Sequence, residues 1–176
     1  MTNLSPSGFL TVGASELEYR MIGPAPDQAP TIVMLHEGLG CVGLWGDFPD
    51  RLQAATSAGV FVYSRAGYGA TTPAALPRQL DYMHIEAREV LPKLLEAIGF
   101  RRGLLLGHSD GASIAAIYAG SHQDHRVQGI AMIAPHFVVE DISVSSIAAI
   151  KRAILEFADG LQAVVESLAA FQPSAA

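Results

Sequence analysis

The chain has 176 residues, 11 Lys and Arg against 17 Asp and Glu, a formal charge of −6, and a hydrophobic fraction of 50%. This length suits one domain with a sizeable core, and the composition excludes a disordered chain, a collagen-like chain and a disulfide scaffold. The acidic balance, with no basic stripe, argues against nucleic-acid binding. The single cysteine, Cys41, has no partner for an internal disulfide.

We expect neither a signal peptide at the start of the sequence nor a membrane-spanning segment within it. Residues 1–7 contain neither Lys nor Arg and precede no apolar run of the kind that a signal peptide has. No uncharged apolar stretch reaches the roughly 18 residues that a membrane span needs. We therefore expect a cytoplasmic protein without a membrane partner.

Short strands dominate the first part of the chain. Residues 9–12 and 16–22 alternate roughly between apolar and polar side chains, which predicts a hairpin at a sheet edge. Residues 31–35 and 60–63 are apolar runs rich in β-branched residues, which is typical of strands buried on both faces. We expect a helix over residues 45–58 between these two strands.

The alternation of strand and helix continues through the middle of the chain. Apolar positions at helical spacing predict a helix over residues 80–98, followed by a buried strand over 103–106. A helix of small residues over 112–119 and a strand over 127–133 come next. This order predicts βαβ units, and therefore an α/β fold with a mostly parallel sheet and helices on both faces.

The last part of the chain contains only helix signals. Residues 138–176 carry no strand pattern, and five apolar residues fall on one helical face: Leu161, Val164, Val165, Leu168 and Phe171. We therefore expect two parts, an α/β core over residues 1–136 and a helical, cap-like segment over residues 137–176.

One motif predicts a nucleophile. Residues 107–111, Gly-His-Ser-Asp-Gly, fit G-x-S-x-G between a predicted strand and a predicted helix. The flanking glycines leave room for a strained turn that exposes the Ser109 hydroxyl, and the helix aims its N–H groups at that hydroxyl. A chance match in a chain with 17 glycines is the competing interpretation. We expect Ser109 to be a catalytic nucleophile.

A second loop predicts the rest of an acyl-transfer site. Residues 36–40, His-Glu-Gly-Leu-Gly, follow the first buried strand and so lie at the same sheet edge. Acyl transfer requires two N–H groups aimed at the developing oxyanion. We expect these groups on Gly38 and Asp110, with Glu37, Leu39 and His108 contacting substrate. An ordinary turn that uses glycine for positive φ is the alternative.

From Phe9 to about His136 the sequence resembles the α/β-hydrolase fold family. The hairpin, the loop 36–40, the loop 64–69 (Ser-Arg-Ala-Gly-Tyr-Gly) and the G-x-S-x-G turn occur in that family's order. The resemblance implies a serine hydrolase of the esterase type that acts, without a cofactor, on carboxylic esters or related small acyl substrates. It also implies that the loop 64–69 is structural, with Arg65 tethering neighbouring loops, and that apolar residues after Val138 cap the site and shape an acyl pocket.

The resemblance implies an incomplete α/β-hydrolase fold. The family places its catalytic acid on a strand after a helical cap and its histidine after the last strand, whereas this sequence reaches Ala176 in what resembles the cap. His136 is the candidate base, with Glu140 or Asp141 to orient it. A non-catalytic loop histidine is the competing interpretation. A catalytically silent scaffold that binds or oligomerises, and a site completed in trans by another copy, are alternative functions.

Two further expectations concern metals and partners. No H-E-x-x-H or C-x-x-C spacing occurs, so we expect no metal site. The strand over 127–133 is interior in the parent fold, and without its neighbour it would present unpaired backbone groups. We therefore expect a homo-oligomer that buries this edge or the C-terminal helices.

Overall fold

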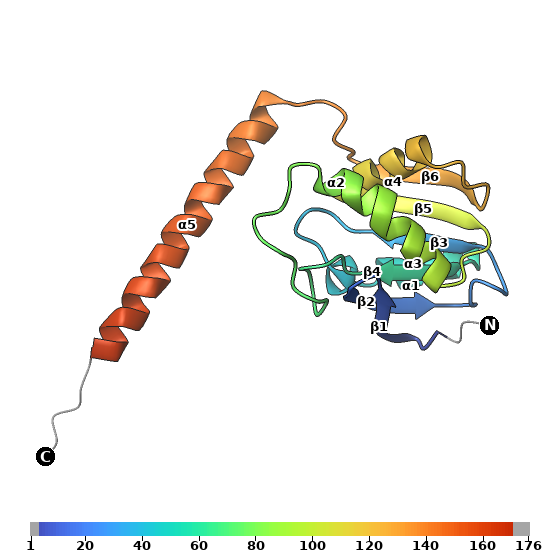
Figure 1. Ribbon diagram of the computed structural model, residues 1–176, viewed down its shortest axis with the longest axis horizontal. Coiled ribbons are helices and arrows are strands. Elements are labelled where there is room, and N and C mark those ends of the chain that lie inside the picture. The colour runs from blue at the N-terminus through green and yellow to red at the C-terminus, as the bar shows by residue number, and fades with distance from the viewer. Residues whose placement is uncertain (1–3, 171–176) are drawn as a thin grey trace, which may run out of the picture. The chain divides into compact units, whose positions relative to one another are not determined.

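The computed structural model describes residues 4–170, except for the side chains of residue 161 and residues 163–170. The backbone divides between His136 and Phe137 into two compact units, which are described separately. The first unit contains the sheet and its helices, and the described part of the second contains one helix, α5 (Asp141–Ala170) (Figure 1). That α5 acts as a cap stays a prediction.

The first unit is built on a six-stranded sheet in the order β1-β2-β4-β3-β5-β6. The first two strands form an antiparallel hairpin whose second strand pairs antiparallel with β4, and the last four strands are mutually parallel. The strands are β1 (Ser7–Val12), β2 (Ser15–Ile22), β3 (Thr31–Leu35), β4 (Gly59–Tyr63), β5 (Gly103–His108) and β6 (Val127–Ile133). The predicted α/β class with a mostly parallel sheet is therefore confirmed.

Two of the predicted helices of the first unit are interrupted in the structure, and the third, predicted over 112–119, spans residues 110–121. Instead of one helix over 45–58, a 3-10 turn η1 (Val42–Trp45) precedes α1 (Phe48–Thr56), because Gly46 between them has a φ of 57°. Instead of one regular helix over 80–98, α2 (Tyr82–Ile85), the π-helical turn η2 (Glu86–Val90) and α3 (Leu91–Ala97) follow one another. Pro92 has no N–H for the carbonyl of residue 88, so the helix widens there.

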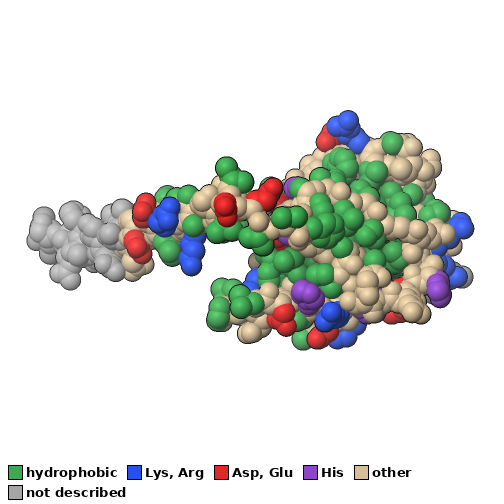
Figure 2. Space-filling view, turned by 90° about the horizontal axis from the view of Figure 1, so that it is seen from above, with side chains coloured by type: hydrophobic (Ala, Val, Ile, Leu, Met, Phe, Trp, Pro, Cys, Tyr) green, Lys and Arg blue, Asp and Glu red, His purple; other side chains and the backbone are tan. Residues whose placement is uncertain are grey.

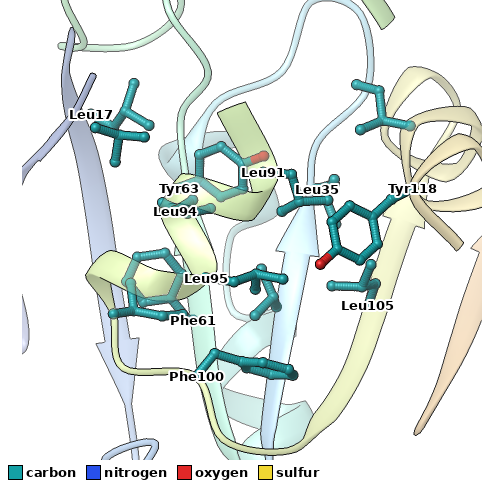
Figure 3. Packing of buried hydrophobic residues seen from close by; sticks show 14 of the residues in the cluster. Leu17, Leu35, Phe61, Tyr63, Leu91, Leu94, Leu95, Phe100, Leu105 and Tyr118 are labelled. Atoms are coloured by element: carbon teal, nitrogen blue, oxygen red, sulfur yellow. The ribbon is translucent and has the colours of Figure 1, made fainter. Parts of the chain in front are cut away.

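Alternate residues of the buried strands face opposite layers of helix. Val33, Leu35, Phe61 and Tyr63 pack with Leu91, Leu94, Leu95 and Ile114 of α3 and α4 (Asp110–Ser121) (Figure 3). Ile32, Met34, Val60 and Val62 pack on the other face with Val42 and, at the periphery, Leu52 of α1. Figure 1 shows the two layers, with α1 on one face of the sheet and α3 and α4 on the other. Burial of each such side chain contributes roughly 1.5–3 kcal/mol.

Strand β6 is an edge of the sheet. Among the described strands it pairs only with β5, and the exposed fractions of Met132 and Ile133 are 39% and 45%. On the face of the first unit seen in Figure 2, hydrophobic surface lies among smaller groups of charged side chains. The expected coverage of the β6 edge by a second copy stays a prediction.

The second unit begins its helix later than the sequence pattern predicts. Helix α5 starts at Asp141, whose carboxylate suits the positive end of the helix dipole, and residues 137–140 precede it without regular structure. The predicted apolar face at Leu161, Val164, Val165, Leu168 and Phe171 lies outside the residues whose side chains are described. None of the described helices is both long enough and apolar enough to cross a membrane.

Candidate active site

Ser109 occupies a strained turn at the carboxyl end of the sheet. It lies between β5 and α4 with φ 53° and ψ −114°, a backbone conformation that residues other than glycine rarely adopt. Its backbone N–H donates a 2.8 Å hydrogen bond to the carbonyl of Ile133 on the neighbouring strand. The turn is thereby fastened to β6.

The glycines on either side of Ser109 allow two close backbone approaches. A Cβ on Gly107 would lie 2.3 Å from the carbonyl carbon of Gly111, and a Cβ on Gly111 would lie 2.1 Å from the carbonyl oxygen of Leu35. Real Cβ atoms do not tolerate such distances, so both positions require glycine. The G-x-S-x-G pattern therefore has a steric cause in this fold.

The structure places His136 beside Ser109. Nε2 of His136 lies 2.9 Å from Oγ of Ser109, and the backbone N–H of His136 donates to Oγ of Ser113 at 2.9 Å. The same Nε2 lies 3.2 Å from Oδ1 of Asp110. Within the described residues of the first unit no carboxylate contacts Nδ1. Glu140 and Asp141 belong to the second unit, so their orienting role stays a prediction.

The loop that follows β3 approaches the start of α4. A Cβ on Gly38 would lie 3.1 Å from Oδ2 of Asp110, so the absence of a side chain lets the loop pass close to that carboxylate. Asp110 is the first residue of α4, where a backbone N–H has no acceptor within its helix. No described residue accepts a hydrogen bond from the N–H of Gly38 or of Asp110. Two unused N–H donors thus lie near Ser109.

The Asp110 side chain is buried between two further groups. The Tyr82 hydroxyl donates to Oδ2 at 2.6 Å, and Nη2 of Arg65 lies 3.7 Å from the same oxygen. Burial and the bond to Asp110 raise the pKa of Tyr82, which therefore stays protonated at neutral pH. Both contacts offset the negative charge of the carboxylate.

His36 braces the loop from beneath. Its ring is fully buried, Nδ1 donates to the carbonyl of Glu37 at 2.6 Å, and Nε2 accepts from the backbone N–H of Arg65 at 3.0 Å. Burial, together with the positive charge of Arg65, lowers the pKa of His36 to about 4. His36 is therefore neutral at pH 7 and holds its loop rather than exchanging a proton.

The three predicted substrate contacts lie around the loop and the turn. Oε2 of Glu37 lies 3.8 Å from Nδ1 of His108, and the ring of Trp45 meets the His108 ring edge-on with centroids 6.4 Å apart. Leu39 is 78% exposed. The structure joins Glu37 to His108, while contact of all three with substrate stays a prediction.

Tyr82 was missed by sequence reasoning, and no motif marks it. It is the first residue of α2, 28 positions from Asp110, so only the packing of that helix beside α4 reveals its contact. Glu86 is likewise unmarked, yet its carboxyl is buried beside the hydroxyl of Tyr63, 3.4 Å away, and burial raises the pKa of this carboxyl. In the part of the chain that the structure describes, no three His, Cys, Asp or Glu side chains group as metal ligands.

Known proteins resemble this chain in sequence and in fold. A human (Homo sapiens) protein, (Lyso)-N-acylphosphatidylethanolamine lipase, is 29% identical over 114 residues, which cover 65% of this chain and 32% of the lipase. A bacterial membrane phospholipase A structure matches with a TM-score of 0.65 and 25% identity, over 77% of this chain and 41% of that one. Carboxylesterase CesB from Bacillus subtilis matches in fold with a TM-score of 0.64 and 18% identity, over 84% and 50%.

The chain therefore spans about a third of the length of its curated relative, 32%, and half or less of these two structures, 41% and 50%. The family model described as "alpha/beta hydrolase fold" matches residues 30–169, which include the loop after β3, the serine turn and β6. The chain belongs to the α/β-hydrolase fold family.

Proposed function

We propose that this chain supplies the nucleophile of a serine hydrolase that cleaves carboxylic esters or related small acyl substrates. One observation carries the proposal: Ser109 lies in a positive-φ turn at the start of α4, with Oγ 2.9 Å from Nε2 of His136. This is the distance a general base needs to accept a hydroxyl proton. The names of the relatives, a lipase, a phospholipase and a carboxylesterase, support the same reaction class.

The proposed reaction proceeds by acyl transfer. Nε2 of His136 takes the proton from Ser109 as Oγ attacks the acyl carbon, and the carbonyl electron pair moves to its oxygen. Collapse of this intermediate breaks the bond to the leaving alcohol, which takes the proton from His136. A water molecule then repeats both steps on the acyl-enzyme, so acid is released and Ser109 is restored.

The negative oxygen of the intermediate requires hydrogen-bond donors. The N–H groups of Gly38 and Asp110 suit this task, because neither has an acceptor among the described residues. The N–H of Asp110 also lies at the positive end of the 12-residue helix α4. In other enzymes the loss of one such donor slows the reaction about 10²–10³-fold.

The rim of the site suggests how an acyl substrate is held. Leu39 offers an exposed apolar side chain to an acyl group, while Glu37 and His108 pair at 3.8 Å and offer polar contacts. The pairing also links the loop after β3 to the residue before the nucleophile. We assign these three residues to substrate contact.

The second candidate is a catalytically silent scaffold, which one feature of His136 favours. Ser109 and Asp110 both contact Nε2, at 2.9 and 3.2 Å, whereas in a Ser-His-Asp triad the acid binds the other ring nitrogen. If Nε2 is protonated and donates a hydrogen bond to Asp110, it cannot accept the hydroxyl proton of Ser109. The two candidates differ in whether Ser109 is activated.

A fluorophosphonate probe separates the two candidates, because it reacts only with an activated serine. The purified chain is incubated with the probe, and the intact mass is measured for the wild type, Ser109→Ala and Ser121→Ala. The last variant removes a serine from the far end of the same helix. One adduct on the wild type and on Ser121→Ala, absent from Ser109→Ala, is expected. No adduct after hours would exclude the hydrolase and leave the scaffold.

A further inference from the structure

Arg65 is a buried cation directly beneath the site. It follows Ser64 at the end of β4 and is 1% exposed, although arginine is rarely fully buried. A buried charge destabilises the fold unless its N–H groups find acceptors and an opposite charge lies nearby. The hydrogen-bond and ion-pair partners of Arg65 therefore indicate the structural role of this buried side chain.

Arg65 and His36 both donate hydrogen bonds to the carbonyl oxygen of Glu37, which also accepts one from the backbone N–H of Gly40 at 3.1 Å. Nη2 of Arg65 donates to the carbonyl of Glu37 at 2.8 Å, and Nδ1 of His36 donates to the same oxygen at 2.6 Å. Nε2 of His36 accepts from the backbone N–H of Arg65 at 3.0 Å and from its Nε at 3.3 Å. These bonds require the proton of the neutral His36 ring to be on Nδ1. The ring therefore connects Arg65 to the Glu37 carbonyl through hydrogen bonds at both nitrogens.

The Glu37 carbonyl belongs to the peptide unit that carries the Gly38 N–H. In a trans peptide the C=O and N–H bonds point in opposite directions within one plane. Because the Glu37 oxygen faces the buried guanidinium, the Gly38 N–H faces away from it. Donors on a carbonyl also polarise its peptide and strengthen the opposite N–H as a donor.

Arg65 also reaches the other half of the site. Nη2 lies 3.7 Å from Oδ2 of Asp110, the residue whose backbone N–H is the second donor. A Cβ on Gly38 would lie 3.1 Å from Oδ2 of that carboxylate. The negative charge of Asp110 therefore repels a negative oxygen that forms beside the Gly38 N–H. The guanidinium offsets this charge. One side chain thus contacts both segments that carry the two N–H groups.

We infer that Arg65 is the positioning residue of the oxyanion hole: it orients the Glu37–Gly38 peptide and offsets the Asp110 carboxylate. The inference rests on the proposed function, and goes beyond it by naming the side chain that orients the N–H donors of the oxyanion hole. Arg65 touches no reacting atom. Its loss therefore affects the rate of the bond-forming step rather than the binding of the probe.

The test compares Arg65→Met, Arg65→Lys and Arg126→Met with the wild type. Arg126 is a matched control, because it forms ion pairs with Glu96 at 2.7 Å and Asp124 at 2.8 Å beside the opposite end of β6. Fluorophosphonate labelling at several probe concentrations gives the maximal rate and the probe concentration at half-maximal rate. Residual dipolar couplings give the direction of the Gly38 N–H.

Arg65→Met is expected to lower the maximal labelling rate about 100-fold, as the loss of one hole donor does, without changing the half-saturating concentration. Arg65→Lys keeps the charge but not the planar fork, so it recovers part of the rate, to within about tenfold of the wild type. Arg126→Met labels like the wild type. The Gly38 coupling is expected to change in Arg65→Met and, to a smaller degree, in Arg65→Lys, and to stay unchanged in Arg126→Met.

Equal maximal rates in all variants would overturn the inference, as would an equal loss in Arg126→Met. If Arg65→Met does not fold, Arg65→Lys decides, since an unchanged rate together with an unchanged Gly38 coupling contradicts the positioning role. If the wild type takes no adduct, the proposed hydrolase fails. The Gly38 coupling alone then decides whether Arg65 orients the peptide.

Discussion

The hydroxyl of Tyr82 donates a 2.6 Å hydrogen bond to Oδ2 of Asp110, which ties the start of α2 to the start of α4. Asp110 is 7% exposed, and a buried polar group destabilises the fold unless it is hydrogen-bonded. The oxygen that accepts this hydrogen bond is the carboxylate oxygen that lies close to Gly38. A residue outside every motif therefore donates a hydrogen bond to the carboxylate next to Ser109.

Tyr82→Phe removes this donor and leaves the Asp110 oxygen without it. We expect the free energy of unfolding to fall by about 1–3 kcal/mol, the usual effect of removing a hydrogen bond to a buried charged group. Urea denaturation measures the change. Tyr19→Phe is the control, because the buried Tyr19 ring stacks on Phe61 and its hydroxyl has no hydrogen bond among the described residues. Equal losses in the two variants would refute the assigned role of Tyr82.

His136→Ala tests the proposed general base. Nε2 lies 2.9 Å from Oγ of Ser109, which is within reach of a proton acceptor, so we expect fluorophosphonate labelling to slow by about 10²-fold or more. His136→Gln keeps a polar side chain without a basic nitrogen, so it should be equally slow. Labelling at the wild-type rate in both variants would show that His136 is a non-catalytic loop histidine.

A mixture of Ser109→Ala and His136→Ala chains tests whether the site is shared between copies. Ser109 and His136 of the same chain are already in contact, so we expect no recovery of labelling in the mixture. Recovery would require a histidine donated by the second chain. It would establish the arrangement in trans.

His36 predicts a loss of stability in mild acid. Burial holds its pKa at about 4 in the folded chain, against 6.5 when unfolded, so the unfolded chain binds more protons between these values. Stability therefore falls as the pH decreases from 6.5 to about 4, by up to roughly 3 kcal/mol from this group, and this contribution changes no further below that pH. Urea denaturation across this pH window, on the wild type and on His36→Gln, measures it. If the free energy of unfolding fell equally with decreasing pH in both proteins, the lowered pKa could not be the cause, because the variant lacks the titrating ring.

The edge at β6 predicts self-association. Met132 and Ile133 are partly exposed on a strand that pairs on one side only among the described strands, and such edges are usually covered. We expect light scattering to give a mass of at least a dimer at micromolar concentrations. A sharp monomer peak would contradict the expected homo-oligomer.

Much of the fold is readable from local pattern. The runs at 31–35 and 60–63 are apolar throughout because both faces of these strands are covered, and the structure buries every residue of β3 and β4. The G-x-S-x-G turn is readable for a similar reason, since steric demands at Gly107 and Gly111 admit only one residue type. Where several causes compete, pattern misleads: apolar spacing predicts a regular helix over 80–98, yet Pro92 introduces a π turn.

By itself, the sequence determined the order of strands and helices, the serine turn and the glycine loop, because each depends on neighbours within a few residues. Only the tertiary structure decided that Arg65, Tyr82 and His136 meet at Asp110 or Ser109, across sequence separations that no periodicity records. The reason is that parallel strands bring the ends of distant segments to one edge of the sheet. The choice of partners there depends on side-chain reach, burial and charge, which exist only after the chain has folded.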